Sequence, residues 1–134
     1  MDGFTVGERV AVGWFGGNCN HCVPCRKGQF MQCVNLQVPS WNYPGGYAES
    51  VTAPATALAR IPDGLSFAEA AAYGAAYLTA YVALVRRARL EPGEWVLVHG
   101  AAGGVGLAAV DLAKALGARV IATSASDDKL AKVR

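Results

Sequence analysis

Apolar and polar residues are patterned differently in the two halves of the chain. In the first half, ERVAV at residues 8–12 alternates with a period of two, and GGYAESVTA at residues 45–53 follows a Gly-Gly turn with strand-forming residues. Both patterns predict short β-strands. The segment between them is polar and rich in turn residues, so we expect strands and loops up to about residue 61.

The second half begins with a helical pattern. Ser66 is followed by Glu69 three residues later, which predicts a capping box at the start of a helix. The apolar run FAEAAAYGAAYLTAYVAL then predicts a buried helix of a globular protein. We expect this helix to bend or be interrupted at Gly74 and to continue towards Arg89.

An α/β pattern follows. WVLVHG at residues 95–100 and ARVIAT at residues 118–123 are short, continuously apolar and bounded by turn residues, as in strands buried on both faces. GGVGLAAVDLAKALG between them predicts a helix ending at Gly117, and SDDKLAKVR predicts the start of another helix with an acidic first turn. The predicted fold class is therefore α/β plus β, with a join near IPDGLS at residues 61–66.

Composition excludes several classes of protein. With 53% apolar and 16% charged residues, the 134-residue chain is not disordered. A net charge of +2, with no basic block longer than Arg86–Arg87, argues against a nucleic-acid partner. The chain has no run of 18 apolar residues free of charges and glycine breaks, and no secretory signal pattern. We therefore expect no membrane partner and a cytoplasmic location.

All four cysteines lie in one window with the spacing C-x2-C-x2-C-x7-C: Cys19, Cys22, Cys25 and Cys33. Tight C-x2-C turns present sulfurs to one ion, and four thiolates satisfy a tetrahedral zinc without leaving an open position. Asn18, Asn20 and Gly28 suit such turns. We predict a structural zinc at these four residues, in a segment too polar to fold by burial alone.

The four thiols could serve three purposes other than zinc binding. Disulfides need an oxidising compartment, and a redox dithiol does not need four cysteines. An iron–sulfur cluster is the strongest rival, but its bacterial motif continues x3-C-P, whereas here Val34 follows the fourth cysteine. His21 is expected to face solvent and His99 to be structural. The aromatic residues that flank the window are expected to pack its base: Trp14, Phe15, Trp41 and Tyr43.

The second candidate site is a glycine-rich turn between a predicted strand and a predicted helix. In dinucleotide folds such a turn lets the backbone approach a pyrophosphate at the helix N-terminus. The usual G-x-G-x-x-G would begin at Ala101, after Gly100, and Gly106 would let the helix approach the strand. A plain βαβ turn is the alternative. The candidate cofactor-binding residues of the turn are Ala101, Ala102, Gly103, Gly104, Val105 and Gly106.

The end of the second predicted strand bears on the choice of cofactor. A carboxylate there would hold the ribose 2′-hydroxyl of NAD. This chain instead has Ser124, followed by Ser126 and Lys129, whose hydroxyls and ammonium suit a 2′-phosphate. NADP(H) is thus favoured over NAD(H). Asp127 and Asp128 argue the other way, although their place suits the dipole of the next helix.

With both motifs present, the chain resembles the medium-chain dehydrogenase/reductase superfamily. VGERVAV, the cysteine window, GGYAE, IPDGLS, LTAYVAL and GAAGGVG occur in the family's order. The resemblance implies a partial GroES-like β domain at residues 1–65 with a structural-zinc lobe at about 14–44. It also implies the start of a Rossmann doubly wound parallel sheet at residues 66–134. The implied activity is hydride transfer between NAD(P)H and a carbonyl or alcohol, a quinone or an activated alkene.

The two halves resemble different branches of that family. Residues 7–62 are similar to zinc-dependent alcohol dehydrogenases, and the chain from Ser66 onward is similar to zinc-independent quinone reductases. Thr79 matches a family position near the nicotinamide. Ala75 stands where the alcohol dehydrogenase branch has a cysteine of its catalytic zinc, so the resemblance implies no catalytic zinc ligand there, and no catalytic residue is assigned.

The length of the chain limits the functional prediction, because members of the family are more than twice as long. We expect a central part of a longer oxidoreductase, with a small-molecule substrate and a homo-oligomeric full-length form, or a chain completed by another chain. A recombined sequence would also explain the mixed character. The alternative from another functional class is a non-catalytic zinc-binding fragment or interaction module.

Overall fold

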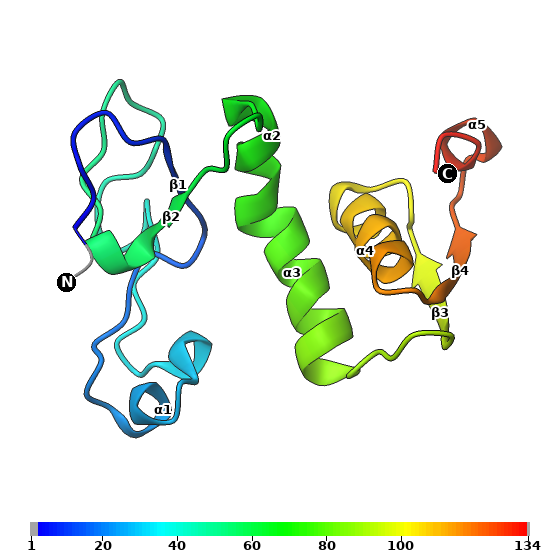
Figure 1. The fold of residues 1–134 in the computed structure, drawn as a ribbon, viewed down its shortest axis with the longest axis horizontal. Helices are drawn as coiled ribbons and strands as arrows, with labels where there is room; N and C mark the ends of the chain where they lie inside the picture. Colours follow the sequence, from blue (N-terminus) through cyan, green and yellow to red (C-terminus); the bar gives the residue numbers. More distant parts are fainter. Residues whose placement is uncertain (1–2, 134) are drawn as a thin grey trace. The chain divides into compact units, whose positions relative to one another are not determined.

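The computed structural model describes residues 3–133 (Figure 1). The chain forms two compact units, Met1–Gly74 and Ala75–Arg134. The division between the units falls within a helical segment, downstream of the predicted join at residues 65/66. The assignment of GroES-like and Rossmann domains to residues 1–65 and 66–134 stays a prediction.

The first unit contains a small antiparallel sheet. β1 (Val10–Val12) pairs with β2 (Leu58–Arg60), with Val10 opposite Arg60. The remaining elements of this part are short: α1 (Val23–Arg26), η1 (Phe30–Gln32) and η2 (Ala55–Ala57). The predicted strand within residues 8–12 is confirmed.

The strand predicted over residues 45–53 is wrong, because the structure has no strand there. Strand-forming residues become a β-strand only when a neighbouring strand satisfies their backbone groups. In the described part of the first unit, β1 takes β2 as its partner. Tyr47 and Val51 are accordingly exposed.

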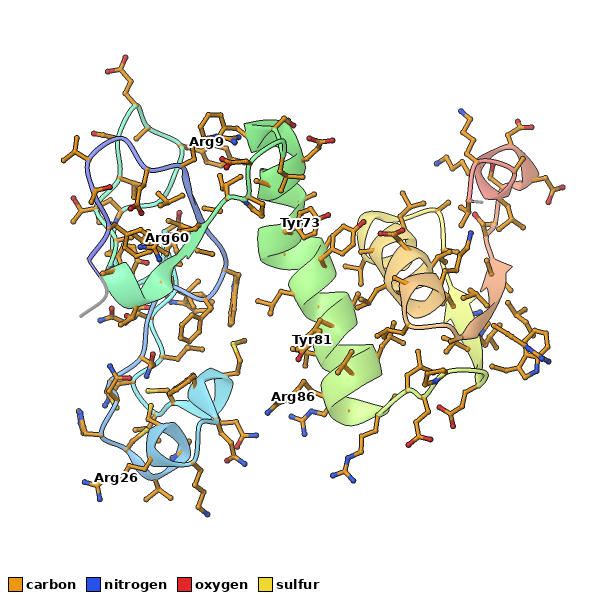
Figure 2. All side chains as sticks on the ribbon, in the orientation of Figure 1. Arg9, Arg26, Arg60, Tyr73, Tyr81 and Arg86 are labelled. Atoms are coloured by element: carbon orange, nitrogen blue, oxygen red, sulfur yellow. The ribbon has the colours of Figure 1, made fainter. Side chains whose placement is uncertain are left out.

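Arg9 attaches the segment after β2 to β1. Its guanidinium donates a hydrogen bond to the carbonyl oxygen of Leu65 and lies over the Phe67 ring, 4.7 Å from the centroid. Figure 2 shows Arg9 beside the start of the long helix. A cation paired with both a carbonyl and an aromatic face fixes where this helix begins.

The long helix runs without a break through four stretches of α and π geometry: α2 (Phe67–Ala72), η3 (Tyr73–Tyr77), α3 (Leu78–Tyr81) and η4 (Val82–Arg87). The capping box of Ser66 and Glu69 is confirmed. Gly74 lies in the first π stretch, where its carbonyl oxygen accepts the Trp14 N–H at 3.4 Å. A side chain on Gly74 would meet the Gly13 Cα at 3.0 Å, so glycine permits this close backbone approach.

The prediction that this helix is buried is wrong for most of its length. Ala70, Ala80 and Leu84 are buried, whereas Tyr73 and Tyr81, labelled in Figure 2, are exposed. The helix thus has more apolar residues than the described part of the chain buries. By length and composition alone, Phe67–Arg87 would suffice to cross a membrane, a weak criterion that core helices of soluble proteins also meet.

After the last part of the long helix, the second unit continues as a β-α-β arrangement. β3 (Trp95–His99) and β4 (Arg119–Thr123) are parallel, with Val96 opposite Val120 and Val98 opposite Ala122. α4 (Gly104–Ala115) connects them, and α5 (Asp127–Leu130) follows β4. Gly117 has a φ of +78°, which ends the α4 segment as predicted.

The core of this unit lies between one face of the sheet and α4. Val98, Ala101 and Val110 are buried together, with Val96 and Val120 packed against them. The opposite face is exposed: Trp95 by 63%, Leu97 by 54% and Ile121 by 50%. The prediction of strands buried on both faces is therefore wrong for the described chain, because α4 covers a single face.

Candidate metal centre and glycine-rich turn

The polypeptide around the four cysteines folds by a sequence of tight turns. Pro24 occupies the first turn of α1, where its missing N–H costs no hydrogen bond. Asn20 has a φ of +60° and Gly28 a φ of +71°, the left-handed region that asparagine and glycine tolerate best. These turns bring Cys25 inside α1 and place Cys33 directly after η1.

The four sulfurs converge. Their Sγ atoms all lie within 4.8 Å of one another, and Cys25 and Cys33 are buried while Cys19 and Cys22 are half-buried. The distance is 3.6 Å from Cys33 Sγ to Cys19 Sγ, 3.8 Å from Cys22 Sγ to Cys33 Sγ and 4.0 Å from Cys19 Sγ to Cys25 Sγ. We call these four residues the cysteine cluster.

These distances fit a single tetrahedral ion. Bonds of about 2.3 Å from zinc to sulfur put the sulfurs of a tetrahedron about 3.8 Å apart. A disulfide requires a sulfur–sulfur bond of about 2.0 Å, and the four thiols are free. A multinuclear iron–sulfur cluster needs more widely spaced sulfurs, because its irons and bridging sulfides must fit between them. The donor set therefore fits one soft, tetrahedral metal ion.

Backbone donors surround the sulfurs. The N–H groups of Cys19 and Asn35 donate to Cys33 Sγ at 3.4 and 3.3 Å. Hydrogen bonds from the backbone of His21, and then of Cys22, lower the pKa of the Cys19 thiol to about 6. Donation to sulfur favours the thiolate, which is the form that binds a metal.

His21 takes no part in the cluster through its ring. The side chain is exposed, and Nδ1 donates to the Cys19 carbonyl oxygen at 2.7 Å. The prediction that His21 is a solvent-facing loop residue is confirmed.

The base of the lobe is closed mainly by backbone. Gly16 N–H donates to the Gln37 carbonyl at 2.8 Å, and Gln37 N–H donates to the Gly17 carbonyl at 3.0 Å. Tyr43 packs here and its hydroxyl donates to the Gly16 carbonyl at 2.9 Å. The prediction that Trp14 and Trp41 also pack the base is wrong, since they are 49% and 82% exposed. Phe15 is half-buried.

The glycine-rich turn of the second unit joins β3 to α4. Gly100 has a φ of +65°, and Gly103 N–H donates to its carbonyl at 2.9 Å. A Cβ on Gly106 would collide with the Gly100 carbonyl oxygen and lie 2.7 Å from the Ala101 Cα. Gly106 therefore lets the helix lie against the turn, whereas a Cβ on Gly104 would meet nothing within 4 Å.

The start of α4 lacks the groups that usually occupy a helix N-terminus. Its N-cap, Gly103, offers no side chain, and the first turn contains no acidic residue. By contrast, Ser66 and Glu69 cap α2, and Ser126 caps α5 beside Asp127. The first N–H groups of a helix have no acceptor within it, and the helix dipole favours an anion there. The α4 terminus thus has the donors and the open space that a phosphate needs.

The end of β4 lies at the same edge of the sheet as this turn, because Ala101 N–H donates to the Thr123 carbonyl at 2.9 Å. Ser124 follows directly, and its Oγ accepts the Ser126 N–H at 3.4 Å. Ser126 Oγ accepts the Lys129 N–H at 3.4 Å. In these contacts both hydroxyls act as acceptors, so each still has a proton that it can donate to a 2′-phosphate.

Thr79 and His99 occupy different settings. Thr79 is exposed on α3, and its hydroxyl donates to the Ala75 carbonyl at 2.7 Å within the helix. His99 ends β3 and its Nδ1 lies 2.9 Å from the Thr123 Oγ1. The roles of Thr79 and of the turn residues in cofactor binding stay predictions.

Two contacts were not anticipated from the sequence. The Asn18 side-chain amide donates to Cys25 Sγ at 3.4 Å. Tyr77 donates its hydroxyl to Asp111 Oδ2 at 2.7 Å, joining η3 to α4. For Asn18 the available signal is a polar residue next to the first cysteine, but such a residue equally indicates a turn. For Tyr77 the sequence offers no signal, because its partner lies 34 residues away and no local pattern identifies it.

Comparisons with known proteins point to alcohol dehydrogenases. Residues 1–63 match the family model described as "Alcohol dehydrogenase GroES-like domain". The chain is 43% identical over 125 residues to an alcohol dehydrogenase of Geobacillus stearothermophilus, covering 93% of this chain and 36% of the relative.

Solved structures agree. A structure described as an NAD-dependent alcohol dehydrogenase matches with a TM-score of 0.91 and 41% identity, over 98% of this chain and 38% of the other. A cobalt- and zinc-bound thermostable alcohol dehydrogenase from Pyrobaculum aerophilum matches with a TM-score of 0.87 and 33% identity, over 99% and 40%. The chain thus spans well under half the length of these proteins.

Proposed function

The chain belongs to the medium-chain dehydrogenase/reductase superfamily, and from that premise we propose that it is part of an NAD(P)H-dependent oxidoreductase. The observation that carries the proposal is the uncapped, glycine-lined start of α4 between two parallel strands. The substrate class is a small carbonyl compound or alcohol, a quinone or an activated alkene. The bound nicotinamide supplies or accepts the hydride.

In this proposal the residues of the glycine-rich turn bind the cofactor's pyrophosphate. The N–H groups at the start of α4 donate to it, and Gly104 leaves space for its approach. Gly106 keeps the turn against the helix, so the donors are held in place before binding. Thr79 would lie near the nicotinamide by its match to the family position.

A charge introduced at Gly104 tests this assignment. Gly104→Asp puts a carboxylate in the open space. The carboxylate interacts favourably with the helix dipole but repels a pyrophosphate. We expect the full-length protein to keep its melting temperature and lose dinucleotide binding, measured by titration calorimetry. Unchanged binding would exclude a pyrophosphate at this turn. Absence of NAD(P)H turnover by the full-length protein, over a panel of quinones, aldehydes and enones, would favour a non-catalytic zinc-binding protein.

The preference between the two nicotinamide cofactors is a separate proposal. Ser124, Ser126 and Lys129 favour NADPH, because no carboxylate stands directly at the end of β4. The description of one similar structure as NAD-dependent favours NADH. Comparing kcat/KM for the two cofactors decides this point. Ser124→Asp should shift the ratio towards NADH by at least about tenfold, equivalent to about 1.4 kcal/mol.

The cysteine cluster is proposed to hold one structural zinc. Its four sulfurs fill a tetrahedral coordination sphere, so no position is open for substrate. Metal analysis of the purified protein should find one zinc per chain beyond any catalytic metal elsewhere in the enzyme. Stoichiometric iron with visible charge-transfer absorption would instead identify a single iron site.

A further inference from the structure

Hydrogen-bond donors reach the sulfurs of the cysteine cluster from two sources. Cys33 Sγ accepts the backbone N–H groups of Cys19 and Asn35, which a substitution to any residue other than proline leaves in place. Cys25 Sγ accepts the side-chain amide of Asn18, at 3.4 Å. Among the residues that the structure describes, the Asn18 amide is the side-chain N–H group that donates to a sulfur of the cysteine cluster.

The Asn18 amide is held in a defined orientation. Its Nδ2 also donates to Asn20 Oδ1 at 2.7 Å. An amide nitrogen carries two protons, so one can serve Asn20 and the other Cys25. Reversing the Asn18 amide would place two acceptor oxygens against each other and one oxygen against the sulfur. Asn18 is half-buried, and its target Cys25 is only 6% exposed.

The need for such a donor follows from charge. Four thiolates around one divalent ion leave a net charge of −2 on the centre. A buried thiolate such as that of Cys25 has little water to share that charge, so a donated N–H stabilises the metal-bound form. Groups that hydrogen-bond to metal ligands commonly change metal affinity by about tenfold to a hundredfold.

We propose that Asn18 is a positioning residue of the metal centre, which strengthens zinc binding by donating its side-chain N–H to the Cys25 thiolate. This inference rests on the proposed structural zinc. It assigns to Asn18 an effect on the affinity and electronic state of the centre, in addition to any effect on the turn.

The experiment measures zinc affinity in the full-length protein by competition with a chromogenic chelator. Asn18→Ala should weaken zinc binding by about tenfold to a hundredfold. Asn18→Asp should weaken it further, because a carboxylate of nearly the same shape repels the thiolate. Asn35→Ala is the matched control: Asn35 donates to Cys33 Sγ through its backbone, so that hydrogen bond survives and affinity should not change.

A spectroscopic measurement separates hydrogen bonding from a purely structural role. With Co²⁺ in the cluster, the thiolate-to-metal charge-transfer bands should move to lower energy in Asn18→Ala, because the sulfur lone pairs lose a stabilising proton. Asn35→Ala should keep the wild-type spectrum. If Asn18→Ala fails to fold, Asn18→Ser, which keeps a shorter donor, serves as the second variant and should show a smaller shift in the same direction.

The outcomes distinguish the two proposals. Wild-type zinc affinity and cobalt spectra in Asn18→Ala, with zinc present at one per chain, would overturn the role of Asn18 alone. Equal losses in Asn18→Ala and Asn35→Ala would also overturn it, since a general loosening of the turns would then explain both. Absence of zinc from the wild-type cluster would overturn the structural zinc and, with it, this inference.

Discussion

The cysteine lobe, residues 14–44, and the β-α-β unit are stabilised in different ways. In the lobe, the buried apolar side chains among the described residues are Cys25 and Cys33, which belong to the cysteine cluster. In the β-α-β unit, Val98, Ala101 and Val110 form a packed apolar core. If the cluster holds the proposed zinc, the stability of the lobe depends on ligands converging on one ion, whereas that of the other unit depends on removing apolar surface from water.

The largest expected effect is the loss of the metal centre. Cys25→Ser removes a buried ligand, and structural zinc contributes on the order of 10 kcal/mol to the folding of small zinc domains. Hydrogen exchange should lose protection across residues 14–44 while β3, α4 and β4 keep theirs. A chelator should reproduce this pattern in the wild type. Uniform loss over both units would show that they fold as one, and that the comparison fails.

The next effect concerns the turn of the second unit. Gly106→Ala places a methyl group against the backbone of Gly100 and Ala101, and such overpacking costs about 1–3 kcal/mol. Denaturant unfolding should show this loss, and dinucleotide affinity should fall with it. Gly104→Ala is the control, because its methyl group meets open space and should leave stability unchanged.

A third variant tests the converse of the first prediction, because it destabilises the second unit and leaves the lobe intact. Val110→Ala opens a cavity in the core between α4 and the sheet and should cost about 1–3 kcal/mol. Exchange should then accelerate in the second unit, while the zinc content and the protection of the lobe stay at wild-type values. Zinc loss in this variant would contradict the independence of the two regions.

The smallest expected effect is a pH dependence of stability that comes from the capping box of α2, outside the lobe. A hydrogen bond from the Ser66 side chain, and then one from its backbone, lowers the pKa of Glu69 below its ordinary value of 4.5. Because the pKa of Glu69 is lower in the folded state, its ionised carboxylate stabilises the fold. This stabilisation is complete above the pKa of the unfolded state and is lost as pH falls through the pKa of the folded state.

Stability should therefore decline slightly more in wild type than in Glu69→Gln as pH falls below about 4.5. Thermal melts of the two proteins at the same series of pH values measure the difference, because any loss of metal from the lobe at low pH affects both proteins alike. Parallel pH profiles in the two proteins would show that the capping carboxylate contributes nothing.

Local patterns in the sequence were sufficient for much of this molecule. The capping box of Ser66 and Glu69, the helix end at Gly117 and the acidic start of α5 are interactions within a few residues of one another. The convergence of Cys19, Cys22 and Cys25 follows from the same kind of short-range geometry, because C-x2-C turns are set by neighbouring residues, and η1 then places Cys33 beside them.

The tertiary structure decided the features that need a distant partner. The sequence cannot state which segment pairs with β1, and the structure chose Leu58–Arg60 over residues 45–53. An apolar strand pattern likewise does not say whether both faces are covered, and α4 covers one. The direction of the Asn18 amide was decided in the same way, since Cys25 reaches it only after the turns between them have formed. Pairing, burial and donor direction depend on contacts between segments, whereas capping and turn formation depend on neighbours along the chain.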